Sequence, residues 1–462
     1  YEICACLVGS EMCIRDRFET KGKENNGAIY GRRSDWQDLY SIAKKYYEAL
    51  LADPGNAQFH LTDPRGASDK SGRTFNNPYQ YFFEQMHMDD AIYADESIYE
   101  YPMQQGGGND GRPYSFGRPS SGGSKAAYPC KSYGQGRINP AYFYGVFDPN
   151  DMRRDVSITM TGSNGKGVEK LIPFVPNSKA EGGGLTLNKW DENRQANPWV
   201  AAQRKSGING PYMRMSEVYL GYAEVCAALG DVVTGKQYLK TVRERSFPQG
   251  LANTDAFIAS FGNDLVRAII EERGFEYAGE GDRRWTLIRS GYLPEDIKRI
   301  KDMTKAMMDG LATKGYYEFE NGNIISAYIW TKLVDAKTIY GHRLTAQCPT
   351  DKVNDPVLYP GWRGQKDNWE EMGLNYGSST PATNLAIKGL FEIVSEEEAA
   401  SLESQGYAKV NWGIDLVDYR DEYDKYLFWD YDYVSAPIYL WPFTPNVMAA
   451  GGFTNGYGFK QE

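Results

Sequence analysis

The stretch YMRMSEVYLGYAEVCAALGDVVTGKQYLKTVRER (Tyr212–Arg245) carries the strongest fold signal in the chain. Apolar residues recur every three or four positions over Met213–Leu229, which predicts a helix with one buried face. Gly230-Asp231 ends this run, and a second periodic run follows over Val233–Arg245. Two helices joined by such a short turn form an antiparallel hairpin.

A hairpin of about 34 residues is typical of tetratricopeptide repeats. The fragment AKKYYEALLADPGN (Ala43–Asn56) resembles the second helix and exit turn of that repeat. It lies in a periodic stretch over residues 35–55, and shorter periodic stretches predict helices over Tyr79–Met88 and Asp264–Tyr277. The sequence therefore predicts a mostly α fold built on tetratricopeptide-like helical hairpins.

Other parts of the chain are harder to assign. Ala94–Tyr99 could extend or follow the preceding helix, and Trp285 begins a further helical turn. Residues 291–440 show a mixed pattern, while residues 441–460 are rich in Pro and Gly and predict coil.

Residues 101–210 form a loop-rich segment. Gly106-Gly107-Gly108, Gly122-Gly123 and Gly182-Gly183-Gly184 interrupt it, and long helices do not tolerate this density of Gly and Pro. We expect short strands here, such as Val156–Met160. Long loops within a compact fold are usually functional or disordered, and the many tyrosines favour a function.

Aromatic rings among the glycines are candidates for ligand contacts, because sugar rings stack on aromatic faces while their hydroxyl groups need polar partners. Gln135 and Asn139 also lie in this region. Any single tyrosine could equally well cover the helical layer. The predicted ligand residues are Tyr114, Tyr128, Tyr133, Arg137, Tyr142 and Tyr144, with a second platform at Trp362, Trp369 and Tyr376.

The composition excludes several classes of protein. The 462 residues carry 51 basic and 61 acidic side chains, a net charge of −10, which argues against nucleic acid as a partner. No stretch approaches the roughly 20 apolar residues of a membrane-spanning helix. Only three histidines occur, so we expect no metal site and no cofactor.

The first 17 residues, YEICACLVGSEMCIRDR, differ in composition from the rest. The spacing of Cys4, Cys6 and Cys13 fits no common zinc or disulfide pattern. The string resembles translated sequencing-adapter DNA, so we interpret residues 1–17 as a non-biological scar and exclude them from the fold. The true N-terminus is then expected to be missing.

A charge-dense block begins within the Asp264–Tyr277 helix pattern and continues past its end. It contains Glu271, Glu272, Glu276 and Asp282 with interspersed arginines such as Arg273. Two carboxyls could act as an acid/base pair for glycoside hydrolysis. Arginines at every step favour the structural interpretation, in which Arg–carboxylate pairs tie a helix end to the next turn.

The order of several motifs resembles the SusD/RagB family. These motifs are ESIYE (Glu96–Glu100), FDPNDMRRD (Phe147–Asp155), Tyr212–Asp231, VRER (Val242–Arg245) and IIEERGFEYAGEGDRRWTLIRSG (Ile269–Gly291). The last motif is the most specific. The resemblance covers about residues 35–300 and extends to WPFTPN (Trp441–Asn446), while residues 300–435 are less familiar.

The resemblance implies a non-catalytic surface lipoprotein of the cell outer membrane. Such a protein captures oligosaccharide and delivers it to a SusC-like TonB-dependent transporter. The lipidated Cys of the family is absent, so the lipid anchor is expected to be lost from this fragment. A peptide-binding RagB-like member and a glycoside hydrolase remain alternatives.

The predicted organisation has five parts. These are the scar at 1–17, an N-terminal helical part at 18–100, the loop-rich ligand-binding segment at 101–210, a tetratricopeptide-like core at 211–300 and a C-terminal SusD/RagB-like part at 301–462.

Overall fold

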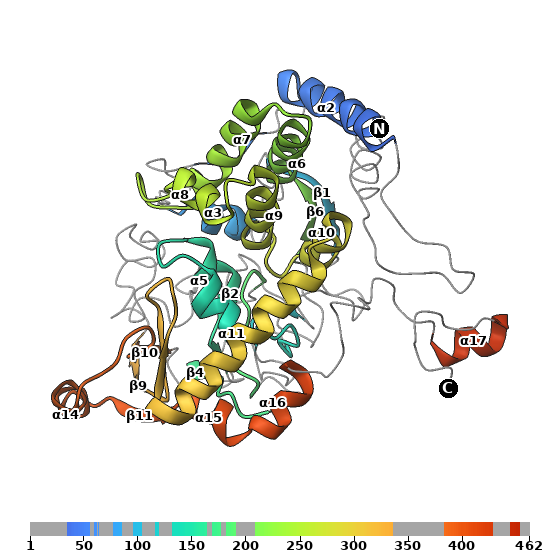
Figure 1. The fold of residues 1–462 in the computed structure, drawn as a ribbon. Helices are drawn as coiled ribbons and strands as arrows, with labels where there is room; N and C mark the ends of the chain where they lie inside the picture. The colour runs from blue at the N-terminus through green and yellow to red at the C-terminus, as the bar shows by residue number, and fades with distance from the viewer. Residues whose placement is uncertain are drawn as a thin grey trace, which may run out of the picture.

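The fold is seen in a computed structural model (Figure 1). It describes residues 35–55, 60–61, 63, 77–85, 96–103, 116–119, 132–163, 169–176, 182–190, 208–335, 383–427 and 444–452. Residues 1–17, predicted to be a scar, lie outside this set.

A layer of packed helices forms the upper part of the molecule (Figure 1). The hairpin expected from the sequence is present as α6 and α7, and α2 and α9 pack against it. The mostly helical prediction is confirmed. The helices of this layer are α2 (Trp36–Ala52), α6 (Met215–Ala228), α7 (Val232–Arg245), α8 (Thr254–Ser260) and α9 (Leu265–Glu276).

Small residues allow these helices to approach closely. A Cβ atom on Gly221 of α6 would lie 2.5 Å from the Tyr47 hydroxyl of α2. A Cβ atom on Gly235 of α7 would lie 2.9 Å from the Ala223 carbonyl oxygen of α6. Both distances are shorter than real Cβ contacts, so the interhelical spacing depends on glycine at these positions.

The long helix α11 (Leu293–Lys314) follows α10 (Asp282–Ser290) and runs across the molecule to α15 (Gly413–Asp418) (Figure 1). The sequence analysis left this region unassigned. Its buried residues Leu293, Thr304, Met307 and Leu311 recur at helical spacing, so the signal was present among many charged residues.

The loop-rich segment contains short elements, as expected. Ser97–Tyr101 is a strand, not the continuation of a helix, because it pairs with Gly210–Arg214. Residues 153–157 are helical, so only Ile158–Thr159 of the strand expected at Val156–Met160 is correct. The elements are α3 (Pro78–Gln85), β1 (Ser97–Tyr101), η2 (Tyr142–Val146), α5 (Arg153–Ser157), β2 (Ile158–Thr159), β3 (Thr161–Ser163), β4 (Glu169–Leu171), β5 (Thr186–Leu187) and β6 (Gly210–Arg214).

Short antiparallel ladders connect these strands. The pairs are β1–β6, β2–β5, β3–β4 and β7–β8, while β9 lies between β10 and β11. The C-terminal elements are β7 (Tyr316–Glu318), β8 (Ile324–Ser326), β9 (Tyr328–Asp335), β10 (Thr383–Lys388), α14 (Glu396–Ser404), β11 (Ala408–Asn411), α16 (Arg420–Leu427) and α17 (Pro445–Gly451). The helix α17 forms where the sequence predicted coil.

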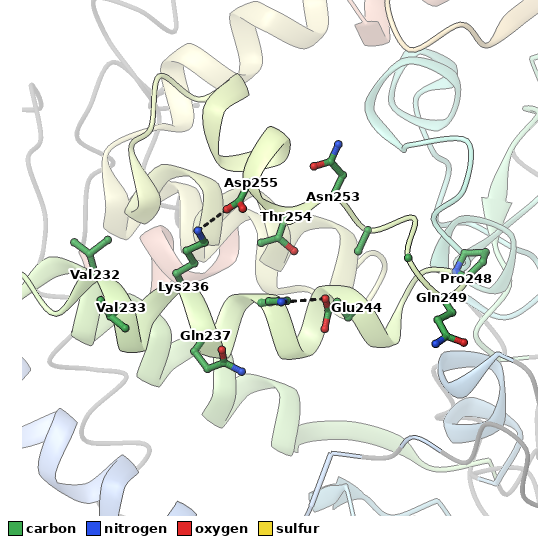
Figure 2. A pocket seen from close by; sticks show the side chains of 13 residues that line it. Val232, Val233, Lys236, Gln237, Glu244, Pro248, Gln249, Asn253, Thr254 and Asp255 are labelled. Carbon is green, nitrogen blue, oxygen red and sulfur yellow. Dashed lines mark ion pairs between the residues drawn. The ribbon is translucent and has the colours of Figure 1, made fainter.

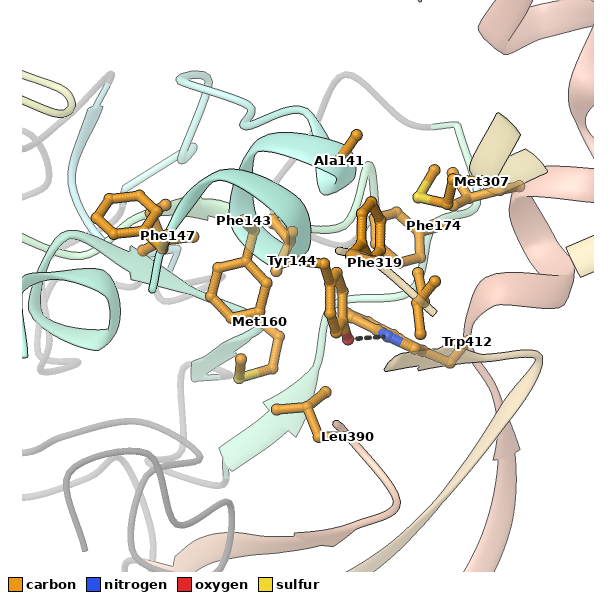
Figure 3. Packing of buried hydrophobic residues seen from close by; sticks show 14 of the residues in the cluster. Ala141, Phe143, Tyr144, Phe147, Met160, Phe174, Met307, Phe319, Leu390 and Trp412 are labelled. Carbon is orange, nitrogen blue, oxygen red and sulfur yellow. Dashed lines mark hydrogen bonds between the residues drawn. The ribbon is translucent and has the colours of Figure 1, made fainter. Parts of the chain in front are cut away.

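The largest hydrophobic cluster joins the loop-rich segment to the C-terminal elements (Figure 3). Phe143 and Tyr144 from η2 meet Phe319, which follows β7, and Trp412, which precedes α15. The ring of Phe174 lies 4.3 Å from that of Trp412 between centroids. Part of the loop-rich segment is therefore core, while the proposed domain boundaries at 100, 210 and 300 stay a prediction.

Candidate functional site

Within the predicted ligand segment, an extended stretch over residues 132–139 lies against β5. The Thr186 hydroxyl donates to the carbonyl oxygens of Gly134 (3.0 Å) and Gly136 (3.1 Å). Gly134 has φ +55°, and a Cβ atom there would lie 2.4 Å from Cγ of Pro119. The glycines thus let this stretch lie flat on the strand beneath it.

Aromatic and planar polar side chains line this stretch. Gln135 is exposed, Tyr133 and Arg137 are half-buried, and Phe116 is 45% exposed. Phe116 lies against Gly136: a Cβ atom added to Gly136 would be 3.3 Å from Cδ1 of Phe116. We call these four residues the Phe116–Arg137 surface.

Arg137 is held where a ligand could meet it. Its backbone forms an isolated antiparallel bridge with Thr186. Its Nε would lie 2.9 Å from a Cβ atom on Gly183, so a larger residue at 183 would displace the guanidinium. Burial lowers the pKa of Arg137 to about 10, and the group stays protonated at neutral pH. It can donate hydrogen bonds to hydroxyl groups.

Two other predicted ligand residues serve the fold. Tyr142 is half-buried, and its hydroxyl donates to the Gly274 carbonyl oxygen of α9 at 2.9 Å. Tyr144 is fully buried, accepts a hydrogen bond from Nε1 of Trp412 at 2.8 Å and stacks on Phe319 (Figure 3). Burial raises the pKa of both phenols. Tyr144 was therefore wrongly expected to present its ring to a ligand.

The remaining predicted residues cannot be placed. Tyr114, Tyr128, Trp362, Trp369 and Tyr376 lie outside the described residues. Asn139, which was expected near a ligand, exchanges hydrogen bonds with Thr304 and caps the backbone of Ala141 at 2.8 Å. It is a structural residue of the turn into η2.

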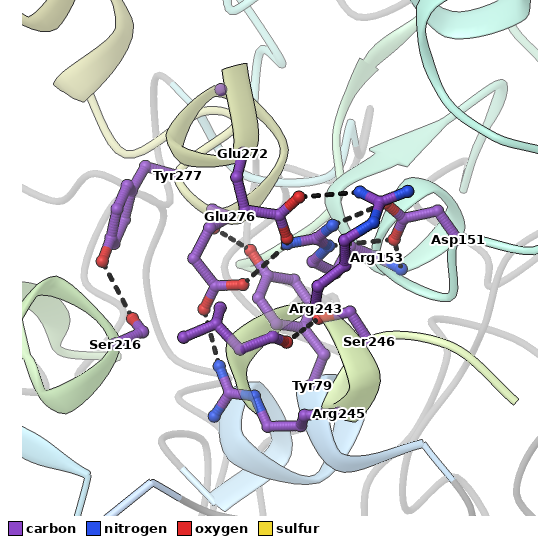
Figure 4. Close-up of polar contacts among 12 residues, drawn as sticks. Tyr79, Asp151, Arg153, Ser216, Arg243, Arg245, Ser246, Glu272, Glu276 and Tyr277 are labelled. Atoms are coloured by element: carbon purple, nitrogen blue, oxygen red, sulfur yellow. Dashed lines mark hydrogen bonds and ion pairs between the residues drawn. The ribbon is translucent and has the colours of Figure 1, made fainter. Parts of the chain in front are cut away.

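Glu272 and Glu276 of the charge-dense block are buried and paired with arginines (Figure 4). Glu272 binds Arg153 (2.7 Å) and Arg243 (2.8 Å). Glu276 binds Arg153 (3.1 Å), Arg214 (2.5 Å) and Arg245 (2.6 Å). Burial alone would raise the pKa of Glu276, but these arginines hold it well below its usual range.

Among the described residues, ion pairs join five acidic and five basic side chains into one network. We call it the buried charge network; its members are Glu96, Asp151, Glu272, Glu276, Glu280, Arg153, Lys189, Arg214, Arg243 and Arg245. Arg273 of α9 also binds Asp282 (2.5 Å), and Glu271 of α9 binds Arg283 (2.7 Å). Arg–carboxylate pairs thus tie the end of α9 to the next turn, so the structural interpretation of this block is confirmed.

The sequence analysis missed a group of exposed tyrosines. Tyr99, Tyr101 and Tyr212 are 56%, 53% and 56% exposed and lie on the paired strands β1 and β6. We call them the tyrosine platform. The alternation in Ser97-Ile98-Tyr99-Glu100-Tyr101 could have indicated a strand with one exposed aromatic face.

A polar groove of about 900 Å³ lies beside α7 and the turn before α8 (Figure 2). Val232, Val233 and an ion pair between Lys236 and Asp255 (2.5 Å) line it. None of its lining residues is aromatic, so it offers no ring on which a sugar could stack.

Two further classes of site were searched among the described residues. They contain no group of three or more His, Cys, Asp or Glu placed to hold a metal ion. They also contain no helix that is both long and apolar enough to cross a bilayer.

These features define a mostly helical protein with exposed aromatic and polar side chains and a structural core of ion pairs. A family model described as the SusD family matches residues 58–442, which is well over half of the chain. The chain belongs to the SusD family.

Individual relatives are distant. SusD-like protein P25 of Formosa agariphila is 28% identical over 160 residues, which are 34% of this chain and 26% of that protein. The chain thus spans about a quarter of the curated relative it matches.

Three solved structures are also similar. A SusD homologue from Bacteroides thetaiotaomicron is 16% identical, with 65% of this chain and 56% of that chain covered and a TM-score of 0.44. Surface glycan-binding protein A from B. thetaiotaomicron, in complex with laminarihexaose, is 19% identical (56% and 52% covered, TM-score 0.37). NanU of B. fragilis is 17% identical (62% and 55% covered, TM-score 0.39).

Proposed function

We propose that this protein captures oligosaccharides at the outer surface of a Gram-negative cell. It passes them uncleaved to a SusC-like TonB-dependent transporter. In this proposal it is a surface lipoprotein of the outer membrane. Membership of the SusD family is the observation that carries the proposal, and glycan binding is the role that family supports.

The Phe116–Arg137 surface is the proposed capture site. It combines two partly exposed rings, Phe116 and Tyr133, with two side chains that hydrogen-bond in a plane, Gln135 and Arg137. Rings can stack on the C–H faces of a sugar, while the amide and guanidinium bind its hydroxyl groups. Such contacts give modest affinity, which suits a protein that must release its ligand.

The test is calorimetry on the full chain, with ligands first found on a glycan array. Laminarihexaose is the first probe, because one similar protein was solved in complex with it. Loss of a stacked ring in Tyr133→Ala or Phe116→Ala should weaken binding roughly tenfold, or about 1–2 kcal/mol. Loss of a charged donor in Arg137→Ala should cost about 1.5–3 kcal/mol.

Tyr419→Ala is the matched control, because Tyr419 is 40% exposed at the end of α15. It should bind as the parent does. If all three site variants bind normally while folded, the capture site lies elsewhere.

Two outcomes would replace the proposed function. Release of shorter sugars from any bound glycan, at a rate well above background, would make the protein a glycoside hydrolase. Binding to a peptide array with no glycan bound would favour a peptide-capturing member of the same family.

A further inference from the structure

The tyrosine platform exposes three large aromatic side chains on one two-stranded ladder. On β6, Tyr212 is exposed while Gly210, Pro211, Met213 and Arg214 are all buried. On β1, Tyr99 and Tyr101 are the exposed residues of the strand, and Ile98 packs toward the cluster that holds Met213. All three rings thus lie on the outward side of one two-stranded ladder.

The rings contact each other without covering their faces. Tyr99 meets Tyr212 edge to face, with centroids 5.6 Å apart and planes at 86°. Tyr101 lies 6.3 Å from Tyr212 at 47°. Since more than half of each side chain stays exposed, these contacts orient the rings but leave surface for a ligand.

The ladder beneath the rings is fixed by the buried charge network. Arg214, next to Met213 at the end of β6, binds Glu96, Glu276 and Glu280. Glu96, directly before β1, also binds Arg245 at 2.5 Å. The buried charge network therefore holds the start of β1 and the end of β6. The platform is preorganised in this way, so little entropy is lost when a ligand binds.

The platform offers no charge to a ligand from its own two strands. The charged side chains of β1 and β6 are Glu100 and Arg214, and both are turned inward. Glu100 is half-buried, burial raises its pKa, and Oε2 accepts a hydrogen bond from Asn209 at 3.0 Å. An anionic or cationic ligand would find no counter-charge on these strands, whereas a neutral polyol needs none.

We propose that Tyr99, Tyr101 and Tyr212 form a second sugar-binding platform, which takes a neutral oligosaccharide chain. Aromatic rings supply stacking faces, their hydroxyls meet sugar hydroxyls, and neither strand offers the counter-charge that an acidic glycan would need. This inference rests on the proposed function. It adds a site on different elements from the Phe116–Arg137 surface and commits it to uncharged sugars.

The test compares ring removal with hydroxyl removal on the full chain. Titrations use laminarihexaose, maltohexaose and the neutral array glycan bound most tightly by the parent. Tyr99→Ala and Tyr212→Ala should each weaken binding of that neutral glycan roughly tenfold. Tyr99→Phe and Tyr212→Phe keep the stacking ring, so they should stay within about threefold of the parent. Tyr419→Ala, with an exposed tyrosine on another element, should not change binding.

The outcomes distinguish failure of the platform alone from failure of the proposed function. If the parent binds a neutral glycan and both Ala variants bind it equally well, the platform is refuted and glycan capture stands. If the parent binds acidic glycans alone, the neutral assignment is wrong. If the parent binds no glycan, the proposed function fails and the platform with it.

Circular dichroism and light scattering complete the design. The Ala variants should keep the parent's spectrum and melting temperature, because these rings point outward. If the parent is a dimer and Tyr212→Ala is a monomer, the face joins two copies of the chain and the proposal is overturned.

Discussion

Glu276 is the residue whose loss should most damage the structure. It is fully buried at the end of α9, and three guanidinium groups converge on its carboxylate. Oε1 accepts from Arg214 at 2.5 Å and Arg245 at 2.6 Å, and Oε2 accepts from Arg153 at 3.1 Å. Glu276→Gln keeps the shape of the side chain but removes its charge.

The magnitude follows from the charge balance. In the buried charge network the five acidic and five basic groups cancel, so the variant leaves one net positive charge away from water. An unpaired buried charge costs roughly 3–5 kcal/mol. Proteins unfold at a cost of only about 5–15 kcal/mol, so this variant should lose a large part of its stability.

The assay is urea unfolding followed by circular dichroism. Asp302→Asn is the control, since Asp302 forms an exposed i,i+4 pair with Lys298 and its side chain is 64% exposed. The control should change the free energy of unfolding by less than about 1 kcal/mol. Adding Arg245→Gln to Glu276→Gln restores neutrality, so the double variant should be less destabilised than the sum of the singles by roughly 1–3 kcal/mol. A loss below about 1 kcal/mol in Glu276→Gln would refute the reasoning.

The same structure supports four further expectations. Deleting residues 1–17 should leave the melting temperature within about 1 °C, because a scar makes no selected contacts; a larger drop in a thermal melt would show that they dock. Gly235→Ala should destabilise, since the added Cβ would lie 2.9 Å from the Ala223 oxygen; overpacking costs roughly 1–3 kcal/mol and outweighs the gain in helix propensity of about 1 kcal/mol. Burial alone would raise the pKa of Glu271, but Arg283 lowers it from the usual 4.5 to about 2. The stability that this ion pair confers is therefore complete above pH 4.5 and is lost as the pH falls toward 2, so the urea midpoint of unfolding should decline across that range. Burial raises the pKa of the Cys226 thiol to about 11, so iodoacetamide at pH 8 should label its peptide far more slowly in the native than in the unfolded protein.

Local periodicity was sufficient for the helical layer. The expected helices at 35–55 and Asp264–Tyr277 correspond to Trp36–Ala52 and Leu265–Glu276 within a few residues. A helix forms its backbone hydrogen bonds within one segment, so its apolar periodicity can be recognised in consecutive residues of the sequence. The structural role of the charge-dense block was also readable, because arginines alternate with its carboxylates.

The burial or exposure of individual tyrosines could not be predicted from local periodicity. Tyr144 and Tyr99 both lie among loops and short strands, yet one is fully buried and the other is 56% exposed. Tyr144 is covered by Trp412, and Tyr99 lies on β1 where the pairing with Met213 and its neighbours on β6 is irregular. Both partners are more than 100 residues away along the chain, and no local pattern specifies such distant contacts. The sequence determined the helices α2, α6, α7 and α9, the family resemblance and the paired charges. Only the tertiary structure decided which rings serve the core and which are exposed, because burial depends on what the rest of the chain brings beside them.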